Sequence, residues 1–137
     1  MQPFRPMWKE VAHTADWALH VQAPDVAALL ITAAQGMYAL MDIRIANSPE
    51  LTQDIHVSAG DVESLLVGFL NELLFRAEEQ RMAFTSFDLT WQNGELNGHL
   101  HGGRITRQAK EIKAVTYHNL RVSAGPAGLE TTVVFDV

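Results

Sequence analysis

The chain has 137 residues, of which 47% are hydrophobic and 19% charged, and this predicts a single domain over residues 1–137 with a core of ordinary size. The chain contains no cysteine, which excludes disulfides, thiolate catalysis and cysteine-based zinc sites. The formal net charge of −6 argues against a domain that mainly binds nucleic-acid phosphates, and it favours a cation or a basic partner.

The N-terminal part predicts two short strands followed by a helix. No signal-peptide pattern opens the chain, and no apolar run reaches the roughly 18 residues that span a bilayer, so we expect a cytoplasmic protein with no membrane contact. Residues 8–12 and 17–22 predict strands, because apolar and polar residues alternate in the second of them. Asp25 is the predicted N-cap of a helix whose apolar stripe runs to Met41.

The middle of the chain predicts one more strand and a second helix. The strand covers residues 51–57, and the helix begins at Asp61. Its apolar stripe over residues 62–74 is the clearest in the chain, so we expect this helix to be the most buried element. The charged residues within 72–81 are interpreted as its solvated face and end.

The C-terminal half predicts strands joined by tight turns. Asn93-Gly94 is a strong signal for a two-residue hairpin, and residues 125–128 predict another turn. Residues 102–107 are predicted to form a mobile loop. Four strands are expected here: residues 84–91, 95–102, 112–122 and 129–137. Together the elements predict an α+β fold with two amphipathic helices packed on a largely antiparallel sheet of about seven strands, in a single two-layer domain.

Carboxylates near the two ends of the chain are candidate cation ligands. Asp16 lies between the first two predicted strands, and Asp136 precedes Val137, whose free α-carboxylate would add a second anionic group. If the last hairpin turns near residues 126–127, Asp136 lies opposite roughly Tyr117, and Lys113 lies only a few residues further along the same strand end. Carboxylate oxygens suit hard cations such as Ca²⁺ or Mg²⁺. The alternative is that Asp16 caps a turn and Asp136 is simply solvated.

Other polar residues admit two interpretations each. Lys113, inside a predicted strand, is either an outward solvated residue or a cation directed at a phosphate, a carboxylate or a partner. His99 and His101 share a strand face and could bind zinc, although no third ligand is evident. Glu10 has no assigned role. No phosphate-binding glycine loop or nucleophile elbow is present.

Four segments of the chain, in order and spanning nearly its whole length, resemble the archease family. They are His13-Thr14-Ala15-Asp16, the helix from Leu65 to Leu74, the strand from Ile112 to His118, and Phe135-Asp136-Val137. This resemblance implies a protein cofactor rather than an enzyme. The implied partner is an RtcB-type RNA ligase of tRNA splicing or RNA repair, whose guanylylation and multiple turnover the cofactor promotes.

The resemblance also implies which residues act. A divalent cation, taken as calcium with magnesium or manganese as alternatives, is expected on Asp16, Asp136 and Val137, and Lys113 is expected to be functionally important. The segment before Lys113 departs from the family, which usually carries a Gly-Glu pair and further acids there. In this chain the segment has Gly103-Arg104 instead, and from Gly102 onward it contains no acidic residue until Glu111.

Two other functions stay open from the sequence. One is a general chaperone or modulator of nucleic-acid-processing proteins, and the other is a small metal-dependent hydrolase that uses Asp16 and Asp136. Strong direct binding to nucleic acid is not expected, and a homo-oligomer is an open alternative to a monomer.

Overall fold

The computed structural model describes residues 6–11, 17–126 and 128–137, and in these ranges the chain forms two helices and nine strands. Every strand pair is antiparallel. The α+β class with two helices predicted from the sequence is therefore confirmed. The nine strands exceed the seven or so predicted and form two sheets instead of one. The elements are β1 (Met7–Val11), β2 (Trp17–Ala23), α1 (Val26–Met41), β3 (Ile43–Ile45), β4 (Leu51–Ser58), α2 (Val62–Gln80), β5 (Met82–Gln92), β6 (Glu95–Gln108), β7 (Ala114–Thr116), β8 (Ser123–Gly125) and β9 (Gly128–Asp136).

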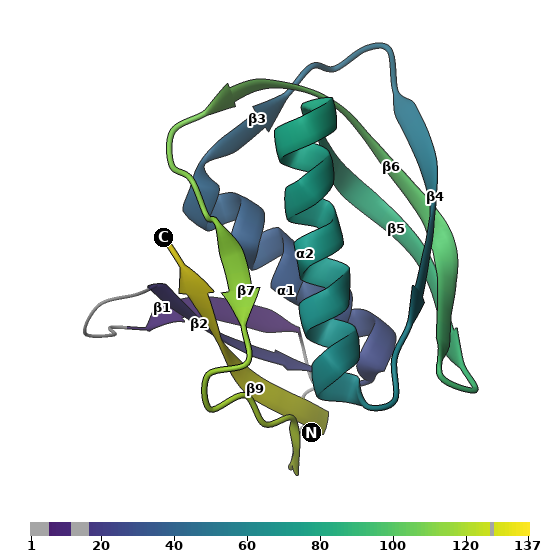
Figure 1. Cartoon of the computed structure of the whole chain (residues 1–137), viewed down its shortest axis with the longest axis vertical. Coiled ribbons are helices and arrows are strands. Elements are labelled where there is room, and N and C mark those ends of the chain that lie inside the picture. Colours follow the sequence, from purple (N-terminus) through teal and green to yellow (C-terminus); the bar gives the residue numbers. More distant parts are fainter. Residues whose placement is uncertain (1–5, 12–16, 127) are drawn as a thin grey trace.

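The strands form two sheets, with the helices packed between them (Figure 1). The five-stranded sheet has the order β1-β2-β9-β7, with β8 also pairing with β9, and in the four-stranded sheet β6 pairs with β3, β4 and β5. Helix α1 contacts strands of both sheets, and α2 contacts β7 on one side and β4 and β5 on the other. Across the described ranges, neither helix combines the length and the apolar character needed to cross a membrane.

Both helices begin at the aspartates expected from the sequence. The Asp25 side chain accepts a hydrogen bond from the Ala28 amide at 2.8 Å, and Asp61 accepts one from the Ser64 amide at 2.7 Å. These contacts satisfy amide groups that have no partner inside the helix. The hydrogen bond from the Ser64 amide, together with one from the Ser64 side chain, lowers the pKa of Asp61.

The prediction that the second helix is the most buried element is wrong. Nine of the 16 residues of α1 are buried, compared with eight of the 19 in α2. Helix α1 touches strands of both sheets, and Gly36 allows its close approach to β2. A Cβ atom at Gly36 would lie 2.6 Å from Cδ2 of Leu19 and 2.9 Å from Cγ of Trp8. Glycine inside a helix lowers its intrinsic stability, and this close packing explains why Gly36 is present there.

The predicted hairpin at Asn93-Gly94 is confirmed, but the loop predicted after it is wrong. Residues 102–107 continue strand β6, which runs to Gln108. Glycine suggested a loop there, but Gly102 lies where two backbones approach each other closely. A Cβ atom at Gly102 would collide with the carbonyl oxygen of Ala83 on β5.

Replacing Gly102 with alanine is therefore expected to destabilise the fold by about 2 kcal/mol or more, because rigid backbone of β5 must move to make room. The matched control is Gly60→Ala, since a Cβ atom at Gly60 meets no atom within 4 Å. Urea unfolding of both variants checks this. Equal unfolding midpoints would contradict the close-approach explanation.

Candidate functional site

Strands β7 and β9 bring Lys113 and Asp136 together. The Lys113 amide donates a hydrogen bond to the backbone carbonyl of Asp136 at 2.8 Å, and Ala114 is the strand partner of Asp136. The sequence predicted Tyr117 in that position, which is wrong by three residues. The correction places Lys113 directly beside Asp136 instead of a few residues away.

The shift arises because the strand predicted over residues 112–122 is interrupted. Thr116 pairs with Val134 of β9, and Ser123 pairs with Glu130. The six residues 117–122 therefore lie opposite only three residues of β9. Asn119 has φ of 50°, and the Leu120 amide donates to the Tyr117 carbonyl at 3.0 Å, which closes a turn. The sequence Gly125-Pro126 correctly located the turn of the hairpin. The extra residues within 117–122 shift the pairing of β7 with β9 away from the register predicted from that turn.

The side chains of Lys113 and Asp136 are exposed, and within the described ranges neither forms an ion pair. Asp16, the other predicted carboxylate, lies outside the residues that the structure describes. Trp17 follows Asp16 in the sequence and is the strand partner of Phe135, which precedes Asp136. The strand contacts thus bring the start of β2 to the end of β9.

The chemistry of these groups fits a hard cation. Asp136 offers an exposed carboxylate that forms no ion pair with any residue the structure describes, and Val137 beside it is 41% exposed. Carboxylate and main-chain oxygens are the ligands that Ca²⁺ and Mg²⁺ prefer. No group of three or more His, Asp or Glu side chains suited to a metal occurs in the described part of the chain. Of the three predicted cation ligands, Asp136 and Val137 are those that the described residues include.

The segment that leads into β7 is fixed to the rest of the molecule. The Met41 carbonyl at the end of α1 accepts hydrogen bonds from the Ala109 and Lys110 amides at 3.2 and 3.1 Å. The Lys110 amino group lies 5.2 Å from the centre of the Trp17 ring, a cation–π contact. This segment also borders a hollow of about 340 Å³ between the C-terminal ends of both helices. Lys113 thus follows an anchored stretch of chain.

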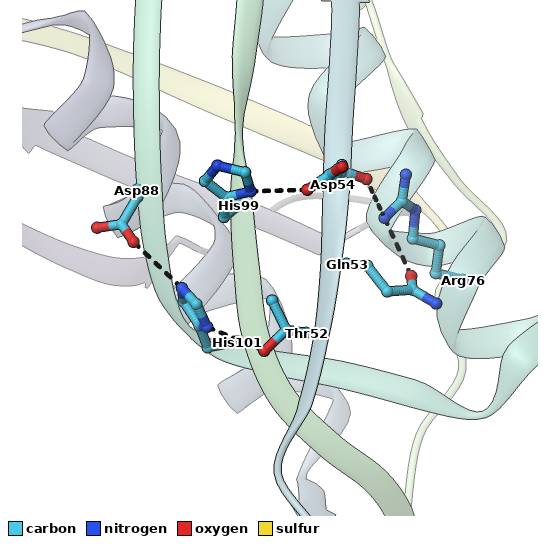
Figure 2. A network of polar contacts seen from close by, with 7 residues as sticks. All are labelled: Thr52, Gln53, Asp54, Arg76, Asp88, His99 and His101. Atoms are coloured by element: carbon cyan, nitrogen blue, oxygen red, sulfur yellow. Dashed lines mark hydrogen bonds and ion pairs between the residues drawn. The ribbon is translucent and has the colours of Figure 1, made fainter.

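A second polar cluster covers the outer face of the four-stranded sheet (Figure 2). Nδ1 of His99 lies 2.7 Å from the Asp54 carboxylate on β4, whereas Nε2 of His101 lies 3.1 Å from the Asp88 carboxylate on β5. Nδ1 of His101 lies 3.2 Å from the hydroxyl oxygen of Thr52. The two histidines thus engage different carboxylates on opposite sides of β6 and do not converge on a shared ligand.

The interpretation of the charged part of α2 as a solvated face is wrong for Arg76, whose side chain is only 13% exposed. Its guanidinium group donates a hydrogen bond to Glu72 at 2.9 Å. It also donates to the Gln53 side chain at 3.1 Å and to the Asp54 carbonyl at 3.0 Å (Figure 2). Arg76 therefore ties α2 to β4.

Glu95 on β6 adds a pH-dependent contact at the end of this face. Its carboxylate accepts hydrogen bonds from Ser58, at 2.7 Å, and from His56, and these lower the pKa of Glu95 below its usual 4.5. A carboxyl group whose pKa is lower in the folded state stabilises the fold above its unfolded pKa. That contribution is lost as the pH falls through the folded value.

The stability difference between the wild type and Glu95→Gln is therefore expected to shrink as the pH falls from about 6 to about 3. Urea midpoints measured across this range check it. The matched control is Glu79→Gln at the exposed end of α2, away from Ser58 and His56. A difference for Glu95→Gln that stays constant with pH would contradict the role of these hydrogen bonds.

Comparison with known proteins places the chain in a family. The model of the archease protein family matches residues 8–137 of the chain. The chain belongs to the archease family. An archease from Methanopyrus kandleri is 34% identical over 84% of this chain and 88% of its own length, and one from Pyrococcus furiosus is 27% identical over 88% and 91%.

Solved archease-family structures have the same fold. The crystal structure of a Thermotoga maritima archease, described as a possible chaperone, has a TM-score of 0.72 at 23% identity and covers 94% of this chain and 96% of its own. The solution structure of a Methanobacterium thermoautotrophicum protein has a TM-score of 0.70 at 22% identity, over 95% and 98% of the two chains. These likenesses confirm the fold.

One residue near the candidate site of this archease-family chain was not predicted from the sequence. Asn71 lies within the apolar stripe of α2, and its side chain contacts the backbone of Val115 in β7. The available signal was a polar residue flanked by Leu70 and Leu73, both of which are buried. The partner of Asn71 lies 44 positions away, so the sequence alone does not identify it.

Proposed function

We propose that this chain activates an RtcB-type RNA ligase through protein–protein contact, in tRNA splicing or RNA repair in the cytoplasm. In this proposal it promotes guanylylation of the ligase and permits multiple turnovers, and it is not itself an enzyme. The observation that supports the proposal best is the pairing of Lys113 with Asp136 at one end of β9. Both side chains are exposed there and free of ion pairs to other described residues.

The proposal includes a divalent cation held by Asp16, Asp136 and the main-chain oxygens of Val137. We expect calcium, with magnesium or manganese as alternatives, because all three ligands supply oxygen. A bound cation would neutralise the two carboxylates and hold the start of β2 against the end of β9. Lys113 would then direct its ammonium group to a phosphate or a carboxylate of the ligase complex.

The test is guanylylation of a cognate RtcB-type ligase with GTP, with and without this protein, under single- and multiple-turnover conditions. A faster first turnover together with continued turnover is the expected result. No change in either would overturn the proposal. Calcium binding by the isolated protein, measured by calorimetry before and after Asp136→Asn, tests the cation separately.

A general chaperone function is the second candidate, and it is motivated by the description of the Thermotoga maritima neighbour as a possible chaperone. A chaperone would suppress aggregation of several unrelated nucleic-acid-processing proteins. The Lys113→Met variant would then retain the effect, whereas a ligase activator would lose its activity with the same change.

A further inference from the structure

Strand β7 is a short edge strand that directly follows Lys113. It has only three residues and pairs with β9 on one side. On its other side lies α2, and the two elements are neighbours in Figure 1. A helix cannot supply the backbone ladder that a neighbouring strand supplies, so the outward N–H and C=O groups of β7 need other partners.

Asn71 of α2 supplies both partners to Val115. Its side-chain oxygen accepts a hydrogen bond from the Val115 amide at 2.9 Å, and its side-chain nitrogen donates one to the Val115 carbonyl at 3.3 Å. A carboxamide presents one acceptor and one donor side by side, as a backbone peptide group does. Asn71 therefore takes the place of a residue in a neighbouring strand. Both bonds are partly buried, which strengthens them relative to exposed ones.

The position of Val115 connects this contact to the candidate site. Val115 is two residues from Lys113, and its strand partner on β9 is Phe135, which precedes Asp136. Residues 117–122 do not pair with β9, so strand pairing holds β7 in the sheet over only three residues. A second attachment through α2 therefore bears directly on the alignment of Lys113 with Asp136.

We propose that Asn71 is a positioning residue, whose carboxamide clamps Val115 and so holds β7 in the register that places Lys113 beside Asp136. The inference rests on the proposed function only for its effect on a ligase. The clamp itself is a property of this fold and can be tested without any partner.

The first experiment is hydrogen exchange on Asn71→Leu and Asn71→Asp. Leucine removes both bonds. Aspartate has nearly the same shape and still accepts from the Val115 amide, but it cannot donate to the carbonyl. Loss of hydrogen bonding worth about 1.4 kcal/mol corresponds to about tenfold faster exchange, and we expect this at Val115 in the leucine variant. The Lys113 amide, which donates to Asp136, should also exchange faster in both variants.

The matched control is Asn97→Asp, because Asn97 is an exposed residue on β6 in the other sheet. It should leave exchange at Val115 and Lys113 unchanged. If Asn71→Leu reduces folding too strongly for a clear comparison, Asn71→Asp decides the question. Unchanged exchange at Lys113 in the folded Asn71 variants would overturn the proposal.

The second experiment is a double-mutant cycle in the ligase assay. Lys113→Arg keeps the positive charge but alters its reach, so partial stimulation should remain. If Asn71 acts through Lys113, Asn71→Leu should lower stimulation about tenfold in the wild-type background and much less in the Lys113→Arg background. Equal losses in both backgrounds would overturn the positioning role. If the wild type itself gives no stimulation, the proposed function fails, and hydrogen exchange at Lys113 still decides whether the clamp exists.

Discussion

Replacing Lys113 with methionine is expected to lower the stimulation of ligase guanylylation by about 10- to 100-fold. The change removes the ammonium group from the exposed end of the site while keeping a side chain of similar length. A hydrogen bond to a charged group contributes about 1.5–3 kcal/mol, and each 1.4 kcal/mol corresponds to a factor of ten. Asp136→Asn should have a comparable effect, because it removes a carboxylate with nearly no change in shape.

The measurement is the initial rate of guanylylation at saturating GTP, with circular dichroism and thermal unfolding to confirm that each variant folds. The matched control is Lys9→Met, because Lys9 is an exposed lysine on β1 at the opposite edge of the five-stranded sheet. This control should retain stimulation. Full stimulation by both Lys113→Met and Asp136→Asn would show that the proposed site does not act on the ligase.

Replacing Phe135 with alanine is expected to destabilise the protein by about 3–5 kcal/mol. Phe135 is 0% exposed and lies on β9 between two strand partners, Val115 and Trp17. Truncating a buried ring leaves a cavity that the surrounding strands fill only in part. Because a domain of this size has a total stability of about 5–15 kcal/mol, this variant should lose a large share of it.

Urea unfolding measures this loss, and Phe75→Ala is the matched control. Phe75 is 54% exposed on α2, so the same substitution should change stability by no more than about 0.5 kcal/mol. If both variants lost a similar amount of unfolding free energy, the burial of Phe135 would not be the cause of its destabilisation.

Local signals in the sequence were sufficient to predict where the helices start and where a tight turn forms. Asp25 caps the first helix as predicted, and the second helix begins after Asp61, where its start was predicted, because an N-cap depends only on the next three residues. Asn93-Gly94 forms the predicted two-residue turn, and both residues have positive φ, of 54° and 75°. These features are decided within a few residues, so one sequence is enough to locate them.

Features decided by distant partners were predicted less well. Strand β3 was not predicted, because its three residues become a strand only through pairing with β6. Gly102 suggested a loop, because the nearby backbone of β5 is not visible in the sequence. The meeting of Lys113 and Asp136 followed from hairpin geometry, but its register depended on the turn at Asn119. Asp16 lies outside the described residues, so its place in the site stays a prediction.

The strand order also determines when the site can exist during synthesis. Strand β9 lies between β2 and β7, and the contact between His20 and Thr132 joins positions 112 apart in the chain. A nascent chain on the ribosome can close the β1–β2 hairpin early, but β7 has no neighbouring strand until β9 emerges. Pairings over such separations close slowly. Premature termination before β9 would therefore release a chain with one sheet incomplete and no place where Lys113 meets Asp136.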